Sequence, residues 1–267
     1  MNTIKAFTVP KVGENYRNSN DRFFFNATKQ GETYFCISDG AGSSFDPTLF
    51  AELITQYPVV NSQTNFEKED IEKIQKEWSE KVERRIESKL FSNKIADLYN
   101  VLKREAGATF VRMCFYEENE KKMWKATALG DSVMLFIPYN EELPQYVVST
   151  NQDCTNEHKY TNSDYVFDAS PDGLLSRSEC NLSKQSGIKD EIKKGTFIFM
   201  TDALAAWVLG THKHTKDRIR KLLKISSHEE FVQFVSGIRD EVDVTDQQGS
   251  VSKKWALIQK LITMIQL

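Results

Sequence analysis

The chain has 267 residues, with 35 basic against 38 acidic side chains, 40% hydrophobic residues and a formal net charge of −3. This length is enough for one large domain or two small ones with a substantial core, and the charge balance argues against a nucleic-acid or membrane-surface partner. The four cysteines form no C-x-x-C pair, and no apolar run is long enough for a signal peptide or a membrane span, so we expect one reduced, soluble, cytoplasmic domain over residues 1–267.

The first part of the chain predicts a hairpin followed by helices. Two apolar runs, FFF and YFCI, flank the polar, glycine-containing stretch NATKQGET, which is typical of a β-hairpin. From about residue 67 to residue 105, apolar side chains recur every three to five positions among charges, which predicts helix. Ser92 and Asn93 interrupt the pattern, so we expect two helices there.

The remainder predicts further strands and three helices. The runs GATFVRMCFY, MWKATAL and VMLFIP, separated by EENEKK and GDS, predict an antiparallel meander. Residues 150–190 are polar and weakly patterned, so long loops with short strands are expected. The run GTFIFM predicts a buried strand leading into a helix at TDALAAWVLG, and two amphipathic helices follow near 215–224 and 227–241. The tail WALIQKLITMI fits either helix or strand.

Four aspartates stand at the boundaries of apolar, strand-like runs: Asp21, Asp39, Asp131 and Asp202. Carboxylates at strand ends point into the crevice at the rim of a sheet or sandwich, where several segments can aim oxygens at one point. Four of them at one point would repel one another, and a hard divalent cation such as Mg²⁺ or Mn²⁺ would remove that repulsion. Gly40 and Gly42 leave the backbone beside Asp39 free to approach an ion or a phosphate.

Other polar residues predict ordinary structural roles. Asp46, Asp153 and Asp172 are interpreted as turn residues. The pair His212 and His214 is more typical of a solvated loop or a C-terminal helix cap than of a metal site. No Ser/His/Asp set and no complete phosphate-binding loop of the G-x-x-x-x-G-K type is present, so no protein nucleophile is predicted.

One family has the same motifs in the same order. The stretches NSNDRFFF, ISDGAGSS, GATFVRMCFY, ALGDSVMLFI and FIFMTDALAAWVLG make the chain similar to the metal-dependent Ser/Thr protein phosphatases of the PP2C type, in their shorter bacterial form, over about residues 10–262. The resemblance implies an α+β fold, a four-layer α-β-β-α sandwich of two antiparallel sheets flanked by helices, with a metal site in the cleft at one end. It implies a phosphorylated protein as substrate, a Ser/Thr kinase or its target as partner, and we expect a monomer.

The resemblance also implies roles for individual residues. Asp39 would bridge two Mn²⁺ or Mg²⁺ ions, with the carbonyl of Gly40 beside it. Asp202 would bind one ion, and Asp131 would support the third, weaker ion that many members have. The early aspartate, Asp21, would bind metal directly or through water.

The implied chemistry needs no protein nucleophile. Two bridged cations lower the pKa of a water held between them, and the resulting hydroxide attacks phosphorus in line. Arg17 is the candidate for the family's phosphate-binding arginine. We therefore predict Asp39, Asp21 and Arg17 as the catalytic residues.

The C-terminus departs from the family pattern and leaves alternatives open. Where the family usually has an Asp-Asp or Asp-Asn pair before its last strand, this chain reads SVSKKWALIQ, with Lys253 and Lys254. We predict Asp246 as the remaining metal ligand, with Asp243 as the alternative. The lysines favour a second hypothesis, a catalytically weak pseudophosphatase that acts as a phosphoprotein-binding or regulatory module. A phosphatase of small phosphorylated metabolites is a third hypothesis.

Overall fold

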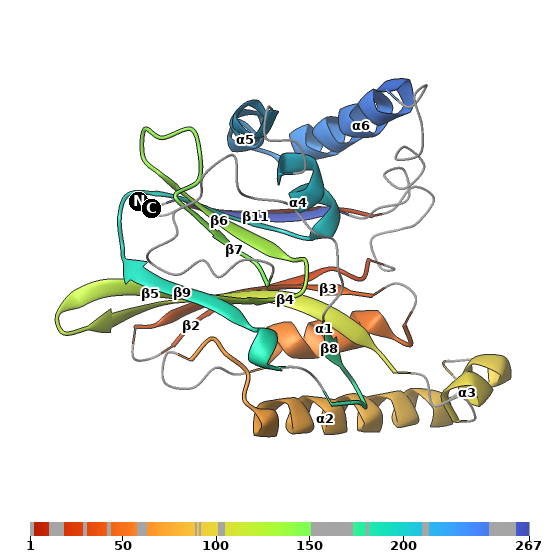
Figure 1. Ribbon diagram of the computed structural model, residues 1–267. Helices are drawn as coiled ribbons and strands as arrows, with labels where there is room; N and C mark the ends of the chain where they lie inside the picture. The colour runs from red at the N-terminus through yellow and green to blue at the C-terminus, as the bar shows by residue number, and fades with distance from the viewer. Residues whose placement is uncertain are drawn as a thin grey trace.

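Two antiparallel β-sheets face each other, with helices outside each sheet (Figure 1). The computed structural model describes residues 3–10, 19–28, 31–41, 44–57, 63–88, 90, 92–100, 105–150, 173–179, 182–209, 214–245 and 260–266. The four-layer α-β-β-α sandwich implied by the sequence resemblance is confirmed.

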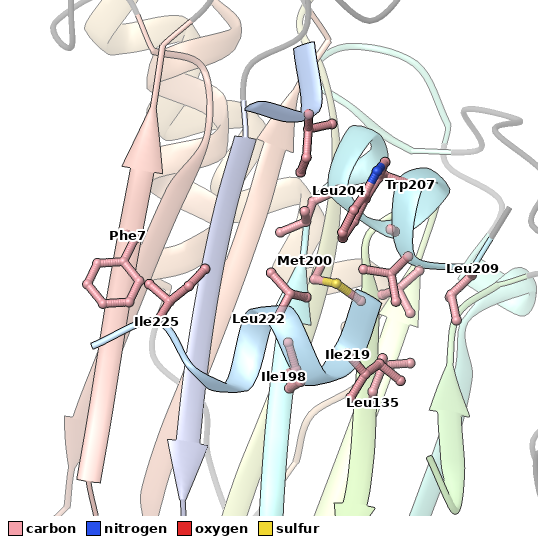
Figure 2. Packing of buried hydrophobic residues seen from close by; sticks show 14 of the residues in the cluster. Phe7, Leu135, Ile198, Met200, Leu204, Trp207, Leu209, Ile219, Leu222 and Ile225 are labelled. Carbon is pink, nitrogen blue, oxygen red and sulfur yellow. The ribbon is translucent and has the colours of Figure 1, made fainter. Parts of the chain in front are cut away.

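The first sheet has the strand order β1-β11-β10-β6-β7, and every neighbouring pair is antiparallel. Helices α4, α5 and α6 cover its outer face, where Ile219 and Leu222 of α5 pack against Leu135 and Ile198 of the sheet (Figure 2). The elements are β1 (Thr3–Val9), β6 (Val133–Pro138), β7 (Tyr146–Val148), β10 (Gly195–Met200), β11 (Lys260–Gln266), α4 (Asp202–Leu209), α5 (Thr215–Leu223) and α6 (His228–Thr245).

The second sheet has the order β2-β3-β4-β5-β9, and the short strand β8 pairs with the start of β4. Helices α1, α2 and α3 lie on its outer side (Figure 1). Phe50 of α1 and Trp78 of α2 are fully buried in the apolar layer between these helices and the sheet. The elements are β2 (Arg22–Ala27), β3 (Thr33–Gly40), β4 (Gly107–Glu118), β5 (Lys121–Leu129), β8 (Leu174–Leu175), β9 (Ser186–Glu191), α1 (Pro47–Gln56), α2 (Lys68–Glu87) and α3 (Asn93–Asn100).

Most of the elements expected from the sequence are present. The FFF and YFCI runs form the β2–β3 hairpin, with Phe23 opposite Ile37. The helical stretch divides into α2 and α3, and α3 begins at Asn93. Helices α5 and α6 are also confirmed, and in the described part of residues 150–190 the strands are short. The ambiguous tail is a strand, β11, inserted between β1 and β10.

The expected three-stranded meander is wrong. Strands β4 and β5 do form a hairpin, but β6 pairs with β10 and β7 in the other sheet. The link through Gly130, whose φ is +90°, therefore carries the chain from one sheet to the other. An apolar run specifies a buried strand but not its partner, because strand pairing depends on distant segments. Strand β1, which pairs with β11, was not predicted.

Helix α1 is fixed at both ends. At its C-terminus the buried Arg112 donates hydrogen bonds to the carbonyl oxygens of Ile54 (3.3 Å) and Tyr57 (2.6 Å), which suits the partial negative charge of a helix end. At its N-terminus Pro47 lies against Gly40, where an added Cβ would be 2.7 Å from the Pro47 carbonyl oxygen. Gly40 is therefore required sterically, and α1 presses directly on the end of β3.

Two glycines give a matched test of the packing. A Cβ at Gly195 would lie 2.4 Å from the Ile137 carbonyl oxygen, so Gly195→Ala must separate β10 from β6 and should lower the free energy of unfolding by about 1–3 kcal/mol. At Gly237, inside α6, an added Cβ meets nothing within 4 Å, so Gly237→Ala should raise it by about 0.5–1 kcal/mol. Urea denaturation of the two variants beside the parent chain measures both changes. Equal effects would contradict the register of β10 and β6.

Candidate metal centre

The four strand-end aspartates lie at one end of the sandwich. In the second sheet, Arg22 pairs with Ser38 and Asp39 pairs with Thr109, so the residue before β2, Asp21, is close to the end of β3. Leu129, the last residue of β5, pairs with Phe110, next to the partner of Asp39. In the first sheet, the last residue of β10 pairs with the first residue of β6. Asp202 and Asp131 therefore flank this same end from the other sheet.

Asp39 interacts electrostatically with all three other aspartates. Burial raises the pKa of the Asp39 carboxyl well above its usual range. The negative charges of Asp21, Asp202 and Asp131, and a hydrogen bond to the Asp21 carboxylate, raise it further. Asp39 is thus the central member of the cluster.

Asp131 lies in the link between the sheets and is only 8% exposed. Its burial, followed by the nearby charge of Asp202, raises its pKa to about 7, although a hydrogen bond from Thr109 partly offsets the rise. The Thr109 hydroxyl also lies 2.8 Å from the Ser132 hydroxyl. Through the hydroxyl of Thr109, strand β4 is therefore bonded to the β5–β6 link.

Asp21 connects the two sheets directly. It is 5% exposed, and its carboxylate accepts a hydrogen bond of 3.3 Å from the Thr201 hydroxyl, at the end of β10. The neighbouring Asn20 accepts a hydrogen bond of 2.8 Å from Thr48 of α1, and its carbonyl oxygen accepts one from the amide of Gly40. The segment before β2 is therefore held by α1, by β3 and by the opposite sheet.

The donor chemistry of this end fits a hard divalent cation. The charges of Asp21 and Asp202 raise the pKa values of Asp39 and Asp131, so the cluster is an environment that a cation stabilises, and all-oxygen ligand sets favour Mg²⁺ or Mn²⁺. Within the described residues, no three His, Cys, Asp or Glu side chains already meet the spacing of a single-ion site. Asp39, which interacts electrostatically with each of the other three, is the central carboxylate of this donor set.

Comparisons with known proteins identify the fold. No family model and no curated protein sequence matches the chain. Solved structures do match: the Ser/Thr phosphatase Stp1 from Staphylococcus aureus has a TM-score of 0.57 at 10% identity, over 100% of this chain and 95% of that one. The S. agalactiae Ser/Thr phosphatase has a TM-score of 0.54 at 10% identity over all of both chains. The photosystem II phosphatase PBCP has a TM-score of 0.53 at 11% identity, over 100% of this chain and 99% of that one.

This chain has the PP2C fold. At these identities the likeness establishes the architecture, and the residue roles that the resemblance implied stay predictions. In the described part of this PP2C fold, no helix has the length and apolar content required to cross a membrane.

The structure does not describe every residue predicted for this site. Arg17 and Asp246 lie outside the described residues, as do Gly42 and the Lys253–Lys254 pair. Asp243, the alternative to Asp246, belongs to the last turn of α6.

The residues assigned structural roles behave accordingly where they are described. Asp46 precedes α1 with a φ of 45° and forms an ion pair with Arg85. His214 is exposed, as expected, but it is the N-cap residue of α5 and not a C-terminal cap. Asp153, Asp172 and His212 lie outside the described residues.

Sequence reasoning missed the hydroxyl groups that support the carboxylates. Thr109, Ser132 and Thr201 are buried, and each bonds either an aspartate or another of these hydroxyls. Two of them could have been predicted from the sequence, because Ser132 follows Asp131 and Thr201 precedes Asp202. Thr109 could not have been predicted in this way, since it lies near the site only because β4 pairs with β3.

The carboxylate repulsion predicts the pH dependence of stability without metal. A carboxyl with a raised folded pKa makes the fold bind more protons than the unfolded chain, so stability falls as pH rises from about 4 through about 7. Asp39→Asn removes the central charge and should raise the melting temperature by about 2–6 °C at pH about 8 in EDTA. Thermal denaturation with and without Mn²⁺ measures this, and Mn²⁺ should stabilise the parent chain more than the variant. The control is Asp217→Asn on the exposed face of α5; a lower melting temperature for Asp39→Asn alone would contradict the proposed repulsion.

Proposed function

We propose that this protein is a metal-dependent phosphatase that hydrolyses phosphoserine or phosphothreonine on a cytoplasmic protein. The supporting observation is the set of four mutually repelling carboxylates at one end of a PP2C fold. The absence of a sequence pattern for a protein nucleophile agrees with attack by water.

The residues of this chain have distinct tasks in that reaction. Two bound Mn²⁺ or Mg²⁺ ions would supply hydroxide at neutral pH and neutralise charge on the phosphoryl group. Asp39 would hold both ions, while Asp21 and Asp202 bring one oxygen donor each from opposite sheets. The buried hydroxyl of Thr201 orients Asp21, and Thr109 orients Asp131. Because these partners come from rigid strand ends, the donors are positioned before any ion arrives.

One sequence feature favours a pseudophosphatase as the second candidate. Lys253 and Lys254 occupy the stretch where a PP2C-like phosphatase usually supplies an acidic ligand. Two cations there would weaken an adjacent metal site, since like charges disfavour each other. The protein would then keep the cleft for binding a phosphorylated segment and lose turnover.

A single assay separates the candidates. The purified chain is tested with p-nitrophenyl phosphate and with a phosphothreonine peptide, with and without Mn²⁺, beside Asp39→Asn and the control Asp217→Asn. We expect Mn²⁺-dependent release of phosphate from the peptide, a loss of about 100-fold or more in kcat/KM for Asp39→Asn, and an unchanged value for Asp217→Asn.

The other outcomes identify the alternatives. Binding of the phosphopeptide without turnover at saturating Mn²⁺ would select the pseudophosphatase. Turnover of small esters but of no phosphopeptide would select a metabolite phosphatase. Failure to bind Mn²⁺ in calorimetry, together with no turnover, would reject the phosphatase.

A further inference from the structure

The four edge strands of the sandwich differ in how they are protected. Strand β9 carries Lys189, Asp190 and Glu191, and β7 is only three residues long and buried. Strand β1 carries Lys5, whose ammonium group donates to the Ile225 carbonyl oxygen. Charged side chains on an edge strand, or a short edge strand, usually prevent the sheet from pairing with another chain. Strand β2, RFFFNA, has three consecutive phenylalanines and a single charge, at its first residue.

The inward face of β2 is exposed. Phe23 and Phe25 pair with Ile37 and Phe35, which belong to the apolar layer between the two sheets. Phe23 is nevertheless 44% exposed and Phe25 is 52% exposed, and Ile4 of β1 beside them is 40% exposed. These three side chains frame a small opening whose inner wall includes Phe35, Ile37 and Phe199. The layer between the sheets thus reaches the surface along β2.

The opposite side of the sandwich is closed, which shows that the opening is a local feature. There the Tyr146 hydroxyl of β7 donates a hydrogen bond of 2.8 Å to Asp190 of β9, joining the two sheets. Tyr146 also packs against Trp124, with ring centroids 5.7 Å apart. In the described residues, no comparable polar bond joins β1 to β2.

We propose that a second copy of this chain covers this edge, its β2 pairing antiparallel with the first β2 across a two-fold axis. Among the described residues, β3 is the only strand that pairs with β2. The other edge of β2 therefore offers backbone groups for pairing, and a strand from an identical molecule brings the matching set. The pairing joins the two second sheets into one continuous sheet and covers Phe23 and Phe25 of both copies. This departs from the monomer expected from the sequence, and it does not depend on the proposed activity.

Symmetry and side-chain direction fix the register. A two-fold axis perpendicular to the sheet leaves equivalent side chains of the two copies on the same face of the joined sheet. Each residue of β2 must therefore oppose a residue whose side chain lies on that same face. Pairing Phe23 with Phe25 of the other copy satisfies this condition and places Phe24 opposite Phe24. The alternative register that pairs Phe23 with Ala27 keeps only one aromatic cross-strand pair, Phe25 with Phe25, and loses the others. Arg22 then opposes the neutral Asn26, so no like charges meet.

Sedimentation of the full chain over a range of concentrations tests the proposal. We expect a species of about twice the 30.7 kDa chain mass. Phe25→Lys places a charge in the covered face and should reduce it to the monomer, and Phe25→Thr, which keeps strand propensity, should weaken the dimer at least tenfold. Tyr139→Lys is the matched control, because Tyr139 is 66% exposed but lies away from β2, and it should leave the dimer intact. A monomer at every concentration, or a dimer unaffected by either Phe25 variant, would overturn the proposal.

Crosslinking tests the register. Position 24 pairs with Cys36 of the same chain, so Cys36 must be removed first. Phe24→Cys, in a background with Cys36 replaced by alanine and Cys154 and Cys180 by serine, should form a disulfide-linked dimer on mild oxidation, because opposed strand residues lie within disulfide reach. The remaining Cys114 is buried and should not react. Tyr139→Cys in the same background should stay monomeric on a non-reducing gel. No crosslink through Cys at position 24 would overturn the register.

Discussion

The aromatic layer between the two sheets is the interaction on which the rest of this molecule depends. Trp124 and Phe136 pack against Phe197, with ring centroids 5.1 and 4.7 Å away. Such contacts add about 0.5–1.5 kcal/mol each beyond the burial of apolar area. The Trp124 indole N–H has no hydrogen-bond partner among the described residues, so the packing must also offset the cost of burying it, about 1–3 kcal/mol. Because Asp39 belongs to one sheet and Asp202 follows a strand of the other, this layer sets the distance between their carboxylates.

The carboxylate cluster, unlike the aromatic layer, lowers the stability of the fold. Burial and mutual repulsion raise the pKa values of Asp39 and Asp131, so these groups oppose folding at neutral pH when no cation is present. Local destabilisation of this kind is typical of functional sites, where charge is positioned for a ligand and stability comes from elsewhere. The hydroxyls of Thr109 and Thr201 reduce the penalty by donating hydrogen bonds.

Strong local patterns made part of this structure predictable. The β2–β3 hairpin follows from two apolar runs on either side of a polar turn, and α2 follows from a helical repeat; both are properties of neighbouring residues. Asp39 could be selected because a carboxylate directly after a buried run is unusual. The role of Arg112 was not predicted, although a single cation inside an apolar strand is unusual. Its hydrogen-bond acceptors are carbonyl groups of α1, more than 50 residues away in the sequence. The β5–β6 link was misjudged because a tight turn between two apolar runs looks the same whether the second strand returns to its own sheet or crosses to the other.

The sequence by itself determined most of the kinds of element and the aspartates at their ends, since these depend on local periodicity and on residue type. The architecture was implied by the resemblance of the ordered motifs to the PP2C family. Only the tertiary structure decided that β6 and β11 belong with β10, that Asp131 therefore stands between the sheets, and that the phenylalanines of β2 lie exposed at an unprotected edge. The physical reason is that strand pairing and burial depend on segments far apart in the chain, so the same apolar run can become a core strand or an open edge according to what packs beside it.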